Sequence, residues 1–372
     1  MRFTIERNEF LKGLTIASRA IGSKSTNPAL LCFKLEITNK GLEITGSNSD
    51  IAIWTLIPVM KGDKEILRDL IPGAVLINAY TLTEFTRKGE GNELTIEVID
   101  NTARITVGKL SANLVCMDGD EYPNISFEQN ATPFTLPCSD LIQLVDQTSF
   151  AALTKETRPV LTAVNLRAEG GKLTATATDS ARLSRKFVSV DPDLRFSSNV
   201  PAKTLSDVTK LLDPGSEVEI SATSEKITFS FNNTIVSSRL IGENYPVSGS
   251  IIPTSFNYFL EVNSQQLLSA IDRISILSQN VVPVVKLSMS EEEVEVSTAN
   301  QQTGFGVEKL STYSYNGDSL EIAFNAVFVS DAVKALGCED VQISFVGEMK
   351  PFVIKNPKDD SVVELITPMR TR

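Results

Sequence analysis

The chain contains 372 residues, with 35 Lys and Arg against 46 Asp and Glu, so its formal net charge is −11. It contains no histidine, which excludes a Ser-His-Asp triad, a Cys-His pair and an HExxH zinc site. Apolar residues make up 42 % and charged residues 22 %, the balance of an ordinary globular protein. The acidic excess argues against a general basic coat for nucleic acid, and the length predicts two or three domains.

The sequence shows neither a membrane span nor a secretion signal. No apolar run approaches the roughly 18–20 residues that cross a bilayer, and residues 1–7 lack the apolar core of a signal peptide. No CxxC spacing occurs among the four cysteines, which are Cys32, Cys116, Cys138 and Cys338. We therefore expect a cytoplasmic protein with four isolated, mostly buried thiols.

A segment in the first third of the chain recurs in the second and third. Residues 81–85 (TLTEF) recur 123 residues later as 204–208 (TLSDV) and, more loosely, 124 residues after that as 328–332 (FVSDA). Each copy is followed by a turn and an alternating strand. One third of 372 is 124, so the sequence predicts three tandem repeats. The expected domains are 1–125, 126–253 and 254–372, with linkers near 125–133 and 247–257.

The repeats predict the same order of elements. Each opens with a short strand, continues with a helix that starts at a polar cap (Asn8, Ser139 or Ser264), and then alternates strands with a second helix. The expected helices are 8–20, 80–88, 139–150, 202–212, 264–274 and 327–336. The predicted fold class is α+β, with two helices and about eight mainly antiparallel strands per repeat. A symmetric homodimer that closes into a ring would remove exposed strand edges.

Four motifs, in this order along the chain, resemble those of a known family. They are residues 157–161 (TRPVL), 177–183 (ATDSARL), 245–246 (YP) and 368–370 (PMR). With the three repeats, they make the whole chain similar to the bacterial DNA polymerase III beta sliding clamp. The resemblance implies three repeats of the DNA-clamp fold and a head-to-tail homodimer that encircles duplex DNA without base-specific contacts. It implies no enzyme activity, no cofactor and no metal.

The resemblance also implies a groove between the second and third repeats. In the family this groove binds short hydrophobic peptides of the replicative polymerase and of other replication and repair proteins, and the clamp loader is a further partner. The positions that match it are Arg158, Leu161, Thr178, Ser180, Arg182, Leu183, Pro246, Ile251, Asn325, Phe328, Met349, Leu365, Ile366, Pro368, Met369 and Arg370. Taken singly, the apolar members are typical of core positions, Arg182 of a surface ion pair and Asp179 of a turn.

This groove departs from the family at three places. Ser180-Ala181 replaces the usual Gly-His, Thr367 replaces a common apolar residue, and Phe328 stands where Tyr is frequent. We expect these changes to alter the preference for partner peptides. An adaptable apolar pocket that includes Met369 and Leu183, with arginines at its rim, suits such peptides.

Charge is distributed unevenly between the predicted helices and the rest of the chain. The six helices sum to +1, which leaves −12 for all other residues, as expected for loose contact with phosphates. The candidate DNA-binding residues are Lys24, Arg87, Lys203 and Lys210, each of which also fits an ordinary solvated charge. By resemblance, the dimer contact uses Leu114 of one chain and Ile276 and Leu277 of the other, with few ion pairs.

The sequence disfavours two other classes of function. A β-rich hydrolase that uses Asp or Glu is disfavoured because no pair of carboxylates stands out as an acid and base. A repeat-built adhesion or scaffold module would usually carry a secretion signal. A eukaryotic-type clamp of two repeats is disfavoured by the third copy. Residues 291–293 (EEE) are expected to form a solvated hairpin tip rather than a metal site.

Overall fold

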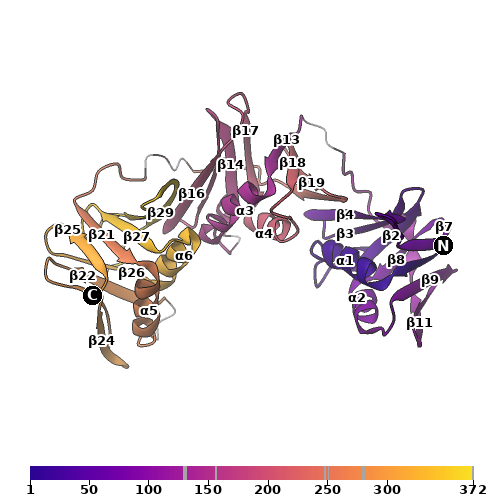
Figure 1. The fold of residues 1–372 in the computed structure, drawn as a ribbon, viewed down its shortest axis with the longest axis horizontal. Coiled ribbons are helices and arrows are strands. Elements are labelled where there is room, and N and C mark those ends of the chain that lie inside the picture. The colour runs from indigo at the N-terminus through magenta and orange to yellow at the C-terminus, as the bar shows by residue number, and fades with distance from the viewer. Residues whose placement is uncertain (129–131, 156, 247–248, 250, 279–281, 371–372) are drawn as a thin grey trace. The chain divides into compact units, whose positions relative to one another are not determined.

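The computed structural model describes residues 1–128, 132–155, 157–246, 249, 251–278 and 282–370 (Figure 1). Parts of both predicted linkers, 129–131 and 247, 248 and 250, lie outside these ranges. The chain divides into two compact units. Unit 1 comprises Met1–Ser139 and Asp207–Leu240, and unit 2 comprises Asp140–Ser206 and Ile241–Arg372. Among the described residues, no helix is long and apolar enough to span a membrane.

The described residues contain six α-helices, two in each repeat, as predicted. They are α1 (Arg7–Ser18), α2 (Ala79–Lys88), α3 (Cys138–Asp146), α4 (Ala202–Thr209), α5 (Ser264–Ser275) and α6 (Ala326–Leu336). The predicted caps were wrong by one residue or more. Asn263, not Ser264, caps α5 because its side chain accepts a hydrogen bond from the Gln266 backbone N–H at 3.1 Å. Asn8 and Ser139 lie inside α1 and α3.

Unit 1 contains two large sheets and a small hairpin. The five-stranded sheet has the order β11 (Leu110–Val115), β10 (Thr102–Val107), β9 (Glu93–Ile99), β1 (Arg2–Glu6) and β7 (Leu67–Ile71). The nine-stranded sheet has the order β12 (Met117–Asp118), β8 (Gly73–Asn78), β2 (Cys32–Thr38), β3 (Gly41–Ser47), β4 (Ile51–Pro58), β20 (Thr234–Arg239), β19 (Lys226–Phe231), β18 (Glu217–Ala222) and β13 (Phe134–Pro137). Strands β5 (Met60–Lys61) and β6 (Lys64–Glu65) form the hairpin, which gives the first repeat more strands than expected.

Unit 2 also contains two sheets. The nine-stranded sheet has the order β17 (Phe196–Pro201), β14 (Ala163–Glu169), β15 (Lys172–Thr178), β16 (Arg182–Ser189), β29 (Asp359–Ile366), β28 (Phe352–Asn356), β27 (Asp340–Phe345), β21 (Tyr258–Asn263) and β25 (Tyr313–Asn316). The four-stranded sheet has the order β24 (Gly304–Lys309), β23 (Val294–Asn300), β22 (Val284–Met289) and β26 (Leu320–Asn325).

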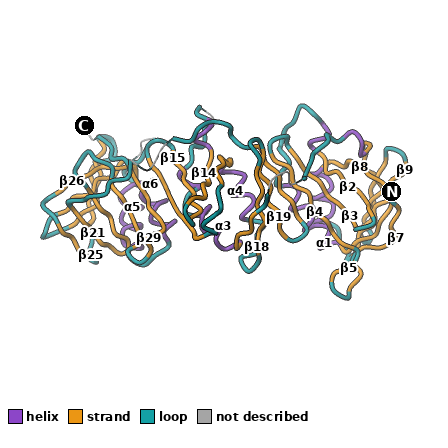
Figure 2. The backbone as a smooth tube through the Cα atoms, turned by 90° about the horizontal axis from the view of Figure 1, so that it is seen from above, coloured by secondary structure: helices purple, strands orange, loops and turns teal. Residues whose placement is uncertain are grey.

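Apolar helix faces pack on these sheets. In unit 1, α1 and α2 lie against each other, and Phe10 and Leu14 join the buried strand residues in one core. In unit 2, α5 and α6 pair in the same way (Figure 2). Leu267 and Val329 belong to the core that they share with β22, β26 and β27. The helical spacing of apolar residues predicted this burial, because it places one stripe of each helix toward a sheet.

Neighbouring repeats are joined edge to edge by antiparallel strands. In unit 1, β4 of the first repeat pairs with β20 of the second. In unit 2, β16 of the second repeat pairs with β29 of the third. In the described part of the chain, β11 and β24 each have a neighbour on one side only, because they end their sheets. Two such pairings between repeats are therefore made within the chain, and among the terminal strands of the described sheets β11 and β24 belong to the outer ends of the first and third repeats.

Candidate functional site

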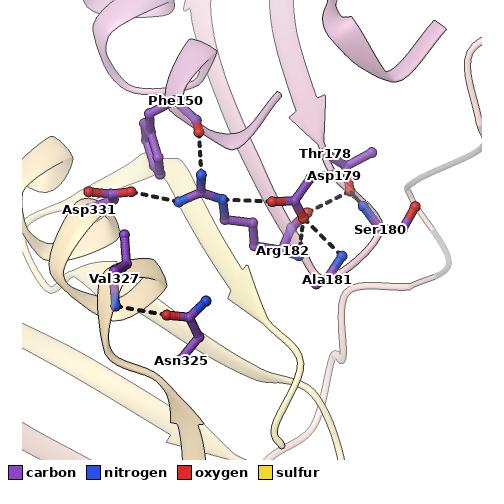
Figure 3. Close-up of polar contacts among 9 residues, drawn as sticks. All are labelled: Phe150, Thr178, Asp179, Ser180, Ala181, Arg182, Asn325, Val327 and Asp331. Atoms are coloured by element: carbon purple, nitrogen blue, oxygen red, sulfur yellow. Dashed lines mark hydrogen bonds and ion pairs between the residues drawn. The ribbon is translucent and has the colours of Figure 1, made fainter. Parts of the chain in front are cut away.

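The guanidinium of Arg182 is the centre of the candidate site in unit 2 (Figure 3). Its Nε donates to Asp179 Oδ2 at 3.1 Å, and one terminal nitrogen donates to Asp331 Oδ2 at 2.8 Å. The other terminal nitrogen donates to the Phe150 carbonyl oxygen at 2.6 Å. Only 12 % of the Arg182 side chain is exposed. Arg182 therefore pairs with carboxylates, as the sequence predicted. Its guanidinium is largely buried, however, and was expected at the surface.

Two aromatic rings complete the surroundings of Arg182. Its guanidinium carbon lies 4.5 Å from the ring centre of Phe328, on α6, and 5.3 Å from that of Phe150. Arg182 thus links the start of β16, the short 3-10 turn Ser149–Ala151 and α6. The sequence analysis identified Arg182 and Phe328 but missed Phe150 and Asp331, because only the fold brings these distant segments together.

The turn between β15 and β16 is built by its own side chains. Asp179 Oδ1 accepts hydrogen bonds from the backbone N–H groups of Ala181 and Arg182, at 2.9 and 3.0 Å. The Thr178 hydroxyl donates to the Arg182 carbonyl oxygen at 2.5 Å. Ser180 has φ +80°, in the left-handed region that favours glycine. The family's glycine suits this backbone better, so serine here carries local strain.

The C-terminal segment lies beside this turn. The Thr367 N–H donates to the Ala181 carbonyl oxygen at 2.9 Å, and the Met369 N–H donates to the Ala323 carbonyl oxygen at 2.7 Å. These bonds hold the segment between the turn and β26. The structure thereby brings the predicted residues of the tail close to Arg182 and Leu183.

An apolar cluster lies under the pairing of β16 with β29. Leu183 faces Leu365 across this pairing, and both are 3 % exposed. The other buried members are Val353 and Val363, and the side chains that cover them are Ile252 and Phe256. None of these four residues was expected from the sequence, although the apolar runs of β28 and β29 indicated burial of Val353 and Val363. Leu183 and Leu365 are therefore chiefly core residues.

The remaining groove candidates differ in exposure. Leu161, Ile366 and Asn325 are buried. The Asn325 side chain accepts a hydrogen bond from the Val327 N–H and so caps α6. Pro368 is buried and Met369 is partly exposed. The candidates open to solvent are Arg158, Pro246, Ile251, Met349 and Arg370. The structure records no contact that joins Arg158, Pro246 or Ile251 to Arg182 in the described residues.

A buried carboxyl group lies next to the apolar cluster. Glu364 accepts a hydrogen bond from the Ser184 hydroxyl at 2.8 Å, and burial raises the pKa of Glu364 well above its usual range. Ser184 and Glu364 face each other across the same strand pair. On that pair, the buried Lys186 ammonium contacts Asp359 at 3.1 Å. No sequence signal distinguished these polar groups from exposed ones.

The predicted DNA and dimer residues are mostly exposed. Lys24, Lys203 and Lys210 are exposed, and in the described ranges none of the three forms an ion pair. Arg87 pairs with Glu84 one turn earlier on α2. Ile276 is 72 % exposed at the end of α5.

The other two dimer candidates lie beside the open strand edges. Leu114 is half-buried on β11 and packs against the core of unit 1. Leu277 lies against Gly306 of β24, where a Cβ added to that glycine would approach a Leu277 methyl group to 2.5 Å.

Comparison with known proteins identifies the class of this fold. Models of the DNA polymerase III beta subunit match residues 1–126 (N-terminal domain), 135–247 (central domain) and 249–370 (C-terminal domain). The beta sliding clamps of Bacillus subtilis and Halalkalibacterium halodurans are 36 % and 35 % identical, over the full length of both chains. The solved sliding clamp of B. subtilis superposes over all of both chains with a TM-score of 0.95 at 35 % identity, and the beta chain of Streptococcus pneumoniae does so with 0.95 at 31 %.

The class is thus the three-repeat sliding clamp, a non-catalytic processivity factor of DNA replication. The chain belongs to the bacterial DNA polymerase III beta subunit family.

The contacts of Arg182 predict the effect of a conservative substitution. In Arg182→Lys, a single ammonium cannot reach both carboxylates and the Phe150 carbonyl, nor stack on Phe328. We expect the free energy of unfolding to fall by about 2–4 kcal/mol, since buried charges lose their partner. Urea unfolding measures this loss. Arg185→Lys, on the same strand, is the control, and equal stabilities of the two variants would contradict the central role of Arg182.

Proposed function

We propose that two copies of this chain close head to tail into a ring around duplex DNA, and that each copy binds partner peptides beside Arg182. The observation that supports ring closure is the equivalence of the open strands to those already paired. β24 occupies the place in the third repeat that β4 and β16 occupy in the first and second. β11 occupies the place in the first repeat that β20 and β29 occupy in the others. Pairing β24 with β11 of a second copy repeats the internal arrangement.

The register of this pairing follows from the internal strands. The equivalent strands β2, β14 and β22 each have a leucine as their fourth residue. Across the pairing with β3, β15 and β23, Leu35 faces Ile44, Leu166 faces Ala175 and Leu287 faces Val296. Three residues after Ile44, Ala175 and Val296 stand Ser47, Thr178 and Ala299. The residues that face these three on β4, β16 and β24 are Ala52, Leu183 and Phe305. These three residues therefore occupy the same position on β4, β16 and β24.

The partner strands align in the same way. Ile96 faces Ile105, Ile220 faces Phe229, and Ile343 faces Ile354. On the other side, Ile105, Phe229 and Ile354 face residues of β11, β20 and β29. These residues are Ala112, Val236 and Glu364, which therefore occupy equivalent positions.

The two internal pairings obey one rule. Ala52 faces Ser237, the residue after Val236, and Leu183 faces Leu365, the residue after Glu364. By the same rule, Phe305 of one copy faces Asn113 of the other. Phe305 is 67 % exposed in the single chain, so this contact would cover an apolar side chain. Leu114 and Leu277, predicted from the sequence, then flank the proposed interface together with Ile276.

A disulfide tests this register. Residues directly opposite on antiparallel strands have Cβ atoms about 4.5–5.5 Å apart, within reach of a disulfide after small adjustment. We expect the double variant Phe305→Cys, Asn113→Cys to form a covalent dimer under mild oxidation, measured on a non-reducing gel.

Two controls accompany the disulfide experiment. Phe305→Cys with Ser111→Cys shifts the register by two residues, and the wild-type chain carries its four native thiols alone. Equal cross-linking of the shifted pair, or none in the matched pair, would contradict the proposed pairing.

We propose that Lys24, Arg87, Lys203 and Lys210 contact phosphates of the enclosed duplex. Their exposure supports this role, and the ion pair of Arg87 with Glu84 weakens its contribution. A few weak contacts without base readout suit a body that slides.

The peptide groove is proposed on the surface that surrounds Met369 and Met349. Met369 is partly exposed and Met349 is half exposed. Both line an open hollow together with Arg370. Flexible thioether side chains adapt to different apolar partners. The backbone bonds of Thr367 to Ala181 and of Met369 to Ala323 connect this surface to the turn that precedes Arg182.

The groove is tested by binding of a short peptide with leucine and phenylalanine side chains and serine flanks. We expect Met349→Lys with Met369→Lys to weaken binding at least about tenfold, because apolar peptide side chains would meet charge. Met60→Lys with Ile71→Lys changes two equally exposed apolar residues of unit 1 and is the control. Fluorescence anisotropy gives the Kd. Unchanged affinity in the Met349→Lys, Met369→Lys variant would show that the peptide does not bind at this surface.

The further partners follow from this function. We propose that the groove binds the replicative polymerase, the clamp loader and other replication and repair proteins with short hydrophobic motifs, in the cytoplasm. The domains that we assign are 1–125, 126–253 and 254–372.

A further inference from the structure

The hollow beside Met349 and Met369 extends beyond the predicted groove. It has a volume of about 800 Å³ and runs over the face of β22, β23 and β26. Its lining includes Lys286, Ser288 and Glu321, which the resemblance did not identify, while Met289, Leu320 and Ile322 belong to the core beneath the same strands. This extension rests on the proposed peptide function, and it contains enough room for residues that flank an apolar motif.

The rim of the extension is acidic. Glu293, Glu295, Glu321 and Glu348 line it, and the only cations among the lining residues that the structure describes are Lys286 and Arg370. Lys286 pairs with Glu321 at 3.1 Å, and Lys309 of β24 pairs with Glu293 and Glu295.

Further carboxylates continue the rim. The hollow reaches Ser290 and Glu293 at the hairpin tip, where the exposed Glu291 and Glu292 stand next to it. The described residues show no ion pair for Glu291, Glu292 or Glu348. With the chain neighbours Asp318 and Lys350 included, seven carboxylates and four cations lie among the described residues in and beside this hollow, so carboxylates are in excess.

We propose that this extension selects partner peptides whose apolar motif is flanked by lysine or arginine. The apolar motif lies on Met349 and Met369, and its basic flank lies along the glutamates toward the hairpin tip. The excess of carboxylates favours a basic flank, because opposite charges attract. The hollow is continuous with the proposed groove, so the flank of a bound peptide would lie in it. An acidic flank meets repulsion from the same carboxylates.

The experiment compares peptides that share one apolar core and differ only in the flank. Each flank, before or after the core, carries two lysines, two serines or two glutamates. We expect one lysine-flanked peptide to bind about tenfold tighter than its glutamate-flanked counterpart at low salt, and this difference to shrink as salt screens the charges. Equal affinities for all flanks would overturn the extension.

A charge-neutralising variant locates the effect. Glu321→Gln with Glu348→Gln removes two exposed carboxylates of the rim, and we expect it to reduce the preference for lysine to about threefold or less. Glu261→Gln with Glu339→Gln removes two exposed carboxylates of the same repeat outside the hollow, and it should keep the full preference. An equal loss of preference in both variants would assign the effect to overall charge and overturn the proposal.

The serine-flanked peptide separates the two proposals. If it binds the wild-type chain and the flanks make no difference, the peptide groove stands and the acidic extension fails. If no peptide binds, the proposed groove itself fails, and with it the extension.

Discussion

The requirement that strand edges find partners is the constraint on which this structure depends. An open edge exposes backbone N–H and C=O groups and apolar side chains, which is costly unless it is paired or protected. The chain meets this requirement twice, where β4 pairs with β20 and β16 pairs with β29. The same logic leaves β11 and β24 with one free side each, among the described residues. In the pairing that we propose, a second copy would satisfy both edges with the geometry that the chain already uses.

Arg182 links the strand pairing between the second and third repeats to α6 and to the turn at Phe150. It starts β16, and its guanidinium holds Asp179, Asp331 and the Phe150 carbonyl. The guanidinium has five N–H donors, and three of them are engaged inside the protein. Arg182 is therefore better suited to hold the groove in place than to bind a peptide by itself. In the proposed groove, the exposed side chains of Met349 and Arg370 would make the direct contacts.

Much of this structure could be predicted from the sequence, because repeats and apolar periodicity report burial directly. The recurrence of residues 81–85 gave three repeats, and helical spacing placed Leu14 and Leu267 in the cores. The helix caps failed because neighbouring polar residues such as Asn263 and Ser264 compete for the same backbone donors. Glu364 and Asp331 could not be predicted, since their roles arise only where β16 meets β29 and α6. The peptide surface came from resemblance, and its acidic extension came from the fold.

Amide hydrogen exchange at several protein concentrations distinguishes an intermolecular pairing of β11 with β24 from open edges. At concentrations where the proposed dimer forms, we expect protection of alternate amides in Leu110–Val115 and Gly304–Lys309. Dilution to the monomer should remove this protection while β4 and β16 stay protected, since their pairing is internal. Rapid exchange in β11 and β24 at every concentration would contradict the account.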